Sequence, residues 1–199
     1  MKTRATILAV LLAAFVTVNT ATWAQSICDA VVGNLVTNCG FETGDFTGWT
    51  QSGNLGFTGV DGNPNSGSFA AYMGPIGSDG YLTQWVGDNS NVYLVAFFLY
   101  NDGGTPNDFT VYWNGVDVGP DLVDADAFSY TEFAGLLSGN VGAGSNELTF
   151  AFRQDPAYWY LDDVVVINAG SSTPEPSSLI LMGSGLLGLV GIVRRKLSV

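Results

Sequence analysis

Two adjacent carboxylates within an apolar run are the residues of this sequence whose chemistry most needs a partner. Asp162 and Asp163 lie in "YWYLDDVVVI", residues 158–167, a stretch of aromatic and β-branched side chains that is typical of a buried strand. Successive side chains of a strand point to opposite faces, so we expect Asp162 to share a face with Tyr160 and Val164, and Asp163 to face the other way. Because both faces are apolar, at least one of the two charges requires a partner.

The composition restricts catalysis to carboxylates. Between residues 25 and 173, Arg153 is the only basic side chain against seventeen Asp and Glu, and the chain contains no His. This excludes Ser-His-Asp and Cys-His catalysis, Schiff-base chemistry and imidazole metal sites. A glycosidase needs two acids facing one cleft, and neighbours on a strand diverge. We therefore predict that the protein is not an enzyme. A net charge near −16 over this stretch argues against nucleic acid as a partner and favours divalent cations.

Short apolar runs separated by turn clusters indicate the fold class. Asn114-Gly115 between "FTVYW" and "VDV" fits a type I′ hairpin turn, since both residues tolerate positive φ. Clusters such as "DGNPNSGS" separate the other runs. The pattern predicts an all-β protein, an antiparallel β-sandwich. The predicted strands are 34–37, 69–73, 81–86, 92–100, 109–113, 116–118, 130–137, 147–154 and 158–167.

The two ends of the chain indicate export. Residues 1–24 have the positive start, apolar stretch and small-residue cleavage site of a signal peptide. The predicted β-sandwich domain spans 25–168, a linker spans 169–176, and 177–199 form a C-terminal transmembrane helix with a basic tail. The apolar run within that helix, 15 residues, would reach only ~22 Å against a hydrocarbon core of ~30 Å, so it is a marginal anchor. The basic cluster that follows would lie in the cytoplasm, and the domain outside the inner membrane.

The tail resembles the PEP-CTERM sorting signal of exopolysaccharide-producing Gram-negative bacteria. The resemblance rests on the order of three parts, namely a Pro-Glu-Pro motif, a short Gly-rich apolar helix and a basic end. The residues that carry it are Pro174, Glu175, Pro176, Arg194, Arg195 and Lys196. It implies recognition by an exosortase-type sorting peptidase, removal of the tail, and delivery to the cell surface or the extracellular matrix. An ordinary membrane anchor behind a Pro-rich linker is the alternative.

Three segments resemble the galactose-binding-like jelly rolls of carbohydrate-binding modules. They are "NLVTNCGFETGDFTGW" at 34–49, "FTVYWNGVDV" at 109–118 and "NELTFAFRQDPAYWYLDDVVV" at 146–166. The resemblance implies a jelly-roll sandwich and, in that family, a structural calcium ion between an acid near the opening strand and an Asp on the last strand. By position, Glu42 and Asp162 match these ligands.

Calcium has two competitors as the partner of Asp162. Calcium takes six to eight oxygen ligands, which suits an acidic domain with one Arg. Asp163 is the weaker ligand candidate, and Asp45 and the carbonyl of Asn38 are further ones. The alternatives are an ion pair with Arg153 across a hairpin, and a solvated carboxylate.

Cys28 and Cys39 are the only cysteines of an exported chain, so we predict a disulfide between them. A loop of this length would stabilise the fold by ~3 kcal/mol in the chain-entropy model.

Aromatic side chains fill sandwich cores and also stack on sugars. Trp49 and Trp85 are predicted to lie in the core. Tyr158 and Trp159 follow a turn and are candidates for exposure and glycan contact, and Trp113 beside the hairpin turn could lie in either place. No subset forms a binding site that the sequence alone identifies.

The sequence thus predicts an exported, exosortase-sorted protein with a structural or adhesive β-sandwich that contacts polysaccharide. The alternative is a dedicated carbohydrate-binding module with a defined glycan ligand.

Overall fold

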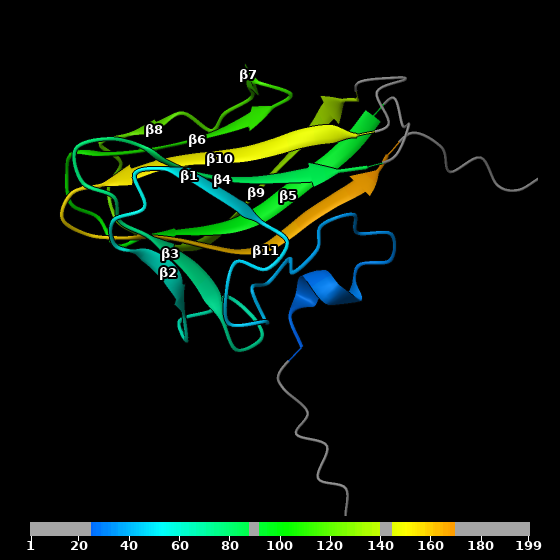
Figure 1. The fold of residues 1–199 in the computed structure, drawn as a ribbon, viewed down its shortest axis with the longest axis horizontal. Coiled ribbons are helices and arrows are strands. Elements are labelled where there is room, and N and C mark those ends of the chain that lie inside the picture. The colour runs from blue at the N-terminus through cyan, green and yellow to red at the C-terminus, as the bar shows by residue number, and fades with distance from the viewer. Residues whose placement is uncertain (1–24, 88–91, 140–144, 170–199) are drawn as a thin grey trace, which may run out of the picture.

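The computed structural model describes residues 25–87, 92–139 and 145–169, which form two antiparallel sheets packed face to face (Figure 1). Sheet A has the order β1 (Thr50–Gly53), β4 (Gly80–Val86), β10 (Asn146–Gln154), β6 (Asn107–Trp113) and β7 (Val116–Asp117), and β8 (Leu122–Val123) also pairs with β6. Sheet B has the order β2 (Thr58–Asp61), β3 (Ala70–Met73), β11 (Trp159–Asn168), β5 (Val92–Asn101) and β9 (Phe128–Ser138). One 3-10 helix, η1 (Ile27–Ala30), precedes the strands. The predicted all-β antiparallel sandwich is confirmed.

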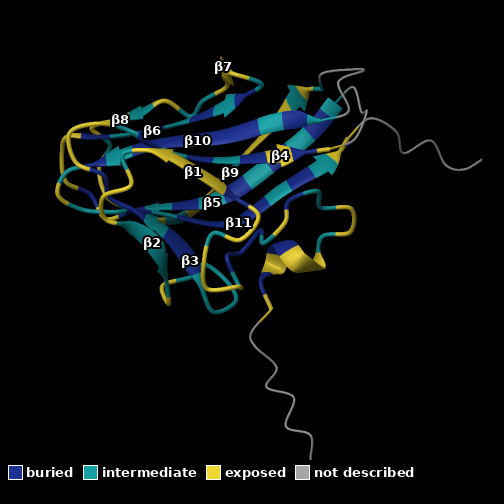
Figure 2. Ribbon diagram, in the orientation of Figure 1, coloured by how far each residue is buried: buried dark blue, intermediate teal, exposed yellow. Residues whose placement is uncertain are grey.

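Alternating burial along the strands produces the two layers. In β5 every second side chain points into the core, and Figure 2 shows the alternation as dark blue and teal bands. The inward residues of β5 include Tyr93, Val95, Phe97 and Leu99, all buried. Burying a side chain of this size contributes about 1.5–3 kcal/mol, which is why the register of a two-layer sheet is strongly specified.

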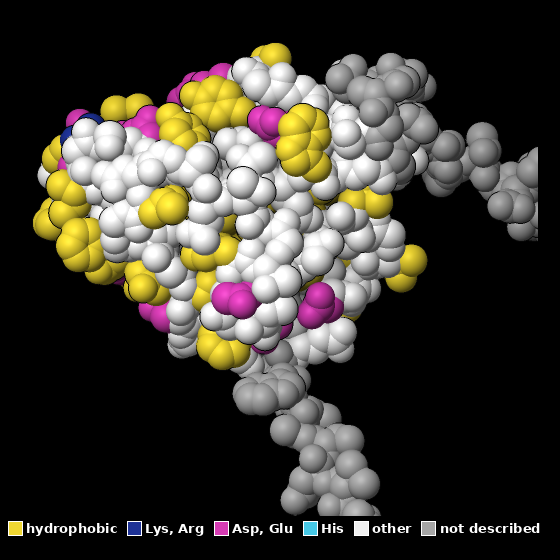
Figure 3. Space-filling model, viewed as in Figure 1, with side chains coloured by type: hydrophobic (Ala, Val, Ile, Leu, Met, Phe, Trp, Pro, Cys, Tyr) yellow, Lys and Arg dark blue, Asp and Glu magenta, His cyan; other side chains and the backbone are white. Residues whose placement is uncertain are grey.

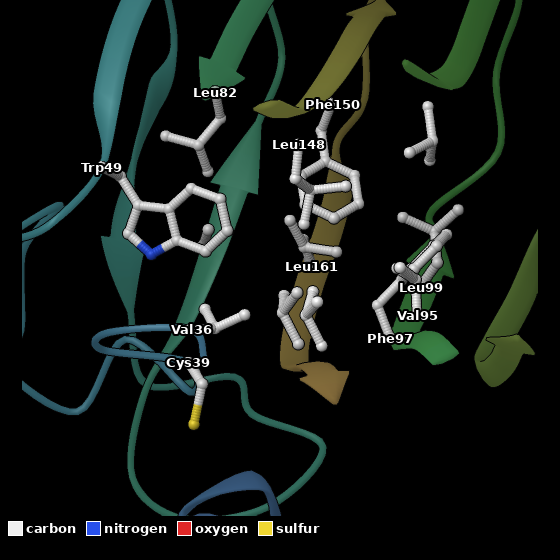
Figure 4. Packing of buried hydrophobic residues seen from close by; sticks show 14 of the residues in the cluster. Val36, Cys39, Trp49, Leu82, Val95, Phe97, Leu99, Leu148, Phe150 and Leu161 are labelled. Carbon is white, nitrogen blue, oxygen red and sulfur yellow. The ribbon is translucent and has the colours of Figure 1, made fainter. Parts of the chain in front are cut away.

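Aromatic and aliphatic side chains from both sheets fill the space between them (Figure 4). Phe150 of β10 lies at the centre, with its ring centroid 5.1 Å from that of Phe97 and 6.0 Å from that of Trp49. Leu82 of sheet A and Leu161 of sheet B are buried in the same core. The core prediction for Trp49 is confirmed.

Eight of the nine predicted strands are present, with ends shifted by at most two residues. The prediction of a strand at 34–37 is wrong, because this segment meets β11 through the backbone bond from Leu35 N to Val166 O (2.8 Å) and through the Asn34 side chain instead of a strand ladder. Asn34 Nδ2 donates to Val164 O (3.1 Å), and Asn34 Oδ1 accepts from Val166 N (3.0 Å). The strands β1, β2 and β8 were not predicted. The Asn114-Gly115 turn has φ values of 53° and 74°, as a type I′ turn requires.

The predicted disulfide between Cys28 and Cys39 is confirmed, with a Cα–Cα separation of 6.1 Å. It ties η1 to the loop before β1, and both halves contact β11. Cys28 N donates to the Asp163 carboxylate (3.3 Å), and Val164 N donates to Cys39 O (2.9 Å). The disulfide therefore secures the N-terminal segment against the last strand.

The predicted signal peptide, PEP motif and C-terminal helix lie outside the described residues. Within the described ranges, no helix is long and apolar enough to cross a membrane.

Candidate functional site

Asp162 and Asp163 both lie on the same side of β11, toward one loop, and both are buried. The expectation that they face opposite ways is wrong, because β11 carries an irregularity between Asp162 and Val165 in its pairing with β5. Asp163 has a φ of 51°, which breaks the alternation of the strand. Such a bulge re-aims a side chain, and here it sets two carboxylates side by side.

The two carboxylates bind the loop between β2 and β3. Asp162 Oδ2 accepts from the backbone amides of Asn65 (2.8 Å) and Ser66 (3.1 Å). Asp163 accepts from Asn65 Nδ2 (2.9 Å) and from Ser66 Oγ (2.8 Å). Ser26 Oγ also donates to Asp163. The acids thus join the N-terminal segment, the loop and the last strand.

Glu42 binds the next residues of the same loop. Its Oε1 accepts from the amides of Ser68 (2.8 Å) and Phe69 (3.2 Å). Gly67 lies between the two anchoring points with a φ of 75°, and a Cβ on it would overlap the Glu42 carboxylate. The structure therefore brings Glu42, Asp162 and Asp163 together on one loop, residues 65–69, which we call the acid-anchored loop.

Burial raises the pKa of Asp162 to about 8, and the charge of Asp163 adds to the effect. Hydrogen bonds from the loop amides act in the opposite direction. The ionised form of Asp162 is therefore costly in this environment, and a nearby cation would favour it.

Arg153 does not supply that cation. Its Nη2 lies 3.1 Å from Asp155 Oδ2, so the predicted alternative of an ion pair with an Asp of β11 is wrong. Two further predicted ligands are also engaged elsewhere. Asn38 O accepts from Trp49 Nε1 (3.2 Å), and Asp45 accepts from Thr43 and Thr47 at an exposed turn.

The donor set at the acid-anchored loop fits calcium in its chemistry. Its groups are carboxylate, hydroxyl and amide oxygens, which are the ligands that this ion prefers. Among the His, Cys, Asp and Glu side chains of the described residues, however, the only group of three with ligand atoms within 4.8 Å of one another is Cys28, Asp29 and Cys39. The two sulfurs of that group are bonded to each other. A calcium ion at the loop would therefore need hydroxyl or backbone oxygens in addition to the acids.

Two of the predicted glycan contacts are wrong, because the side chains are buried. Trp113 is 4% exposed and donates from Nε1 to Ser138 O (2.8 Å). Trp159 is fully buried and donates to Arg153 O (2.9 Å). Tyr158 is half-buried, on the outer face of sheet B.

Trp85 is 62% exposed, so the prediction that it lies in the core is also wrong. In β4 the side chains of Leu82, Gln84 and Val86 point inward, which places Trp85 on the outer face. Gln84 tolerates burial because its amide group bonds Thr37 N (2.7 Å) and Thr37 O (3.0 Å). The strict alternation of "YLTQWV" could have indicated this, had the polar Gln84 been assigned to the core.

Trp85 belongs to a defined surface on the outside of sheet A. Register and alternation place it beside Glu147, and place Thr83, Thr149 and Tyr112 in the next cross-strand row. A further row contains Tyr81, Ala151 and Thr110. We call this surface the sheet A face, with the residues Tyr81, Thr83, Trp85, Thr110, Tyr112, Glu147, Thr149 and Ala151.

The sheet A face has small side chains along its middle strand and aromatic rings to either side. Thr149 and Ala151 of β10 lie between Tyr81 and Trp85 on β4 and Tyr112 on β6. The rings of β4 are four residues apart, or roughly 13 Å, and β4 and β6 are roughly 10 Å apart. The surface therefore offers spaced aromatic rings with hydroxyl and carboxylate groups between them.

A comparison with protein families identifies the tail, and residues 172–196 match the PEP-CTERM protein-sorting motif. The sorting-signal prediction for Pro174, Glu175, Pro176 and the basic cluster is confirmed. The motif marks the chain for export with a membrane-anchored sorting signal.

Solved structures with a similar fold include several carbohydrate-binding modules and part of the enzymatically active domain of a bacteriophage CBA120 tailspike protein. TmCBM61, solved in complex with beta-1,4-galactotriose, has a TM-score of 0.53 at 21% identity, over 68% of this chain and 98% of that one. Family 16 Carbohydrate Binding Module-2 has a TM-score of 0.50 at 17% identity, over 67% and 99%. The CBM22-1-CBM22-2 tandem domain of Xyn10C from Paenibacillus barcinonensis has a TM-score of 0.51 at 19% identity, over 72% and 48%. Identities this low show the fold alone. No curated protein matches the sequence significantly.

Proposed function

We propose that this chain is an exported protein of the cell surface or extracellular matrix whose β-sandwich binds polysaccharide through the sheet A face, without catalysis. The sorting motif supports release by an exosortase-type peptidase, and the jelly-roll fold of carbohydrate-binding modules supports sugar contact. The observation that carries the proposal is Trp85, a large ring that is 62% exposed on the outer face of a sheet.

The chemistry of the sheet A face suits a sugar chain. The C–H surface of a pyranose ring is apolar and stacks on an indole or phenol ring, while its hydroxyls need hydrogen-bond partners. Trp85, Tyr81 and Tyr112 supply the rings. Glu147 beside Trp85 and the half-buried Thr83 supply the partners, whereas Thr149 is buried and its hydroxyl is bonded to that of Thr83 (2.8 Å). The acids of β11 are buried beneath the acid-anchored loop, so they do not face an open cleft as a catalytic pair would.

A dedicated carbohydrate-binding module with a defined glycan ligand is the second candidate. The grouping of three rings around a narrow middle strand favours it, because fixed spacing selects for particular sugar geometries. A matrix protein with general adhesive contact would bind long polymers but show no saturable affinity for short oligosaccharides. A dedicated module would bind a trisaccharide to hexasaccharide with one-to-one stoichiometry.

A structural calcium ion at the acid-anchored loop is a further part of the proposal. Asp162 and Asp163 would hold it together with hydroxyl or backbone oxygens, and Glu42 would hold the next residues of the loop. The support is the burial of two adjacent acids with no basic side chain bound to them in the described ranges. When bound, the ion would supply positive charge that favours the ionised acids.

The binding proposal is tested with the Trp85→Ala variant. Titration calorimetry of the exported protein with β-1,4-galactan, xylan and mixed-linkage β-glucan should show affinity for at least one polymer, and Trp85→Ala should weaken it at least about tenfold. Leu136→Ala is the matched control, because Leu136 is 68% exposed on a strand of sheet B. An unchanged affinity for Trp85→Ala, or no binding to any polymer by the unmodified protein, would refute the proposal.

A further inference from the structure

A row of tyrosines crosses the outer face of sheet B, on the opposite side of the sandwich from Trp85. Tyr160 of β11 is the direct cross-strand partner of Tyr72 on β3 and of Tyr100 on β5. Tyr130 on β9 extends the row, and Tyr158 lies immediately before β11 with its ring against that of Tyr160. These five residues, which we call the tyrosine face, span four adjacent strands, or roughly 14 Å.

The rings of the tyrosine face touch one another in a continuous series. The ring centroids of Tyr100 and Tyr160 are 5.4 Å apart with planes at 76°, and those of Tyr100 and Tyr130 are 5.6 Å apart at 45°. Tyr72 and Tyr158 form an edge-to-face pair at 5.5 Å and 89°. Edge-to-face contact alternates the ring planes and fixes each ring, so little side-chain entropy remains to be lost on binding.

Two glycines make room for these rings. A Cβ on Gly59 of β2 would overlap the Tyr72 ring, and a Cβ on Gly74 would lie 2.7 Å from the Tyr158 ring. Tyr72 can therefore lie across its neighbouring strand. The outer side of a sandwich sheet is normally polar. Five half-buried aromatic rings on this side consequently need an explanation other than the core.

The groups around the tyrosine face are acidic and polar. Tyr130 Oη donates to Asn63 O (2.7 Å). A hydrogen bond to Asp102 raises the pKa of Tyr100, and burial followed by the charges of Asp61 and Asp102 raises the pKa of Tyr160. The only basic side chain of the described ranges, Arg153, is paired with Asp155. Figure 3 shows acidic groups spread over the visible surface and basic colour at one edge only.

This charge pattern selects among ligands that stack on aromatic rings. An anionic polymer would meet Asp61 and Asp102 without a cation to balance its charge. A neutral sugar chain has apolar C–H surfaces for the rings and hydroxyl donors for the two carboxylates. The surface is therefore complementary to a neutral polysaccharide.

We propose that the tyrosine face is a second polysaccharide-binding surface, specific for neutral chains, so that one domain binds a chain on each side of the sandwich and links the two. The inference rests on the proposed function of the sheet A face. Since the two sheets pack only about 10 Å apart, one small domain would join two polymers closely.

The test is a bridging assay with the exported protein. Protein is bound to beads coated with β-1,4-galactan or xylan, whichever it binds, and the beads are washed and offered the same polymer carrying a fluorophore. The unmodified protein should capture the labelled polymer. Tyr100→Ala should still bind the beads through the sheet A face but should lose at least about nine-tenths of the capture. Tyr100→Phe, which keeps the ring, should retain most of it, which separates loss of the surface from loss of the fold.

The outcomes separate the two proposals. Bridging by Tyr100→Ala at the unmodified level, with an unchanged melting temperature, would overturn the inference. So would complete loss of bead binding in Trp85→Ala, because one surface would then account for all binding.

If Tyr100→Ala instead abolishes self-association seen by analytical ultracentrifugation without polysaccharide, the face is a contact between copies of the chain and the inference is wrong. Absence of any polymer binding by the unmodified protein would refute the sheet A proposal and this one together. Polygalacturonate should not be captured, and its capture in place of neutral polymer would also contradict the inference.

Discussion

Asp162 and Asp163 differ from an ordinary pair of strand neighbours because the register of β11 shifts between Asp162 and Val165. Asp163 adopts a positive φ, and both acids turn toward the loop at 65–69. The family resemblance pairs Glu42 with Asp162, but strand alternation predicts that Asp163 faces away from them, and the structure contradicts this. The bulge that turns both carboxylates toward one loop could not be predicted from the sequence. A bulge depends on which strands pair, and "LDDV" contains no Gly that would indicate one.

The pH dependence of stability tests the environment of Asp162. Its pKa is about 8 in the folded protein, against about 3.9 for an unfolded Asp. The folded state therefore holds a proton more tightly than the unfolded state, so stability is greatest below pH 4 for this group and falls as pH rises toward 8. We expect the free energy of unfolding in EGTA to fall by a few kcal/mol between pH 5 and pH 8. Urea denaturation at several pH values measures it.

The Asp162→Asn variant is the control, and it should show a much smaller fall over the same pH range. Millimolar calcium, if bound at the acid-anchored loop, should abolish the fall in the unmodified protein, since it stabilises the folded state with ionised acids. Equal unfolding free energies in calcium and EGTA at pH 8 would contradict the calcium proposal.

At the scale of elements, the strands with long apolar runs could be predicted, whereas the short edge strands β1 and β2 could not. The runs that form β5, β6, β10 and β11 are rich in β-branched and aromatic side chains and lie between turn clusters, which indicates strands. In contrast, β1 is exposed at all four positions and β2 is half-buried at all four, so neither has a hydrophobic period. The prediction that Trp85 lies in the core is wrong for a related reason. It rests on the apolar character of the ring, whereas the alternation of side chains in β4 places Trp85 on the outer face.

The acid-anchored loop gives a prediction at the element scale. Gly67→Ala combines a positive φ with overlap between the new Cβ and Glu42, whereas Gly33→Ala has a similar φ of 82° with no atom within 4 Å. Both variants pay the backbone cost of about 1 kcal/mol. We expect Gly67→Ala to lower the unfolding free energy by about 1–3 kcal/mol more than Gly33→Ala. Equal effects in thermal or urea denaturation would show that Glu42 does not fix the loop.

At the scale of the whole molecule, a compact acidic sandwich is joined to a sorting tail. The tail at 172–196 could be predicted from sequence because its parts follow one another in the chain. The sheet A face could not, since it is assembled from three strands that are distant in sequence. Nothing in the sequence marks its Thr, Tyr and Glu residues as neighbours, because only the strand register places them side by side.

Processing gives a prediction at this scale. We expect the exported protein to begin at Gln25 and to lack the apolar segment after the Pro174-Glu175-Pro176 motif. Intact-mass spectrometry of protein recovered from the extracellular matrix measures both ends. A mass that includes Lys196 would contradict removal of the tail.

The central claim, that polysaccharide binds over Trp85, is tested most directly by tryptophan fluorescence. Among the four tryptophans of the described ranges, Trp49, Trp113 and Trp159 are at most 7% exposed, whereas Trp85 is 62% exposed. Quenching by acrylamide should therefore report mainly on Trp85. Saturation with a polymer that calorimetry shows to bind should shift the emission to the blue and protect it from quenching, and neither change should occur in Trp85→Phe. Binding that leaves the emission and the quenching of the unmodified protein unchanged would contradict the account.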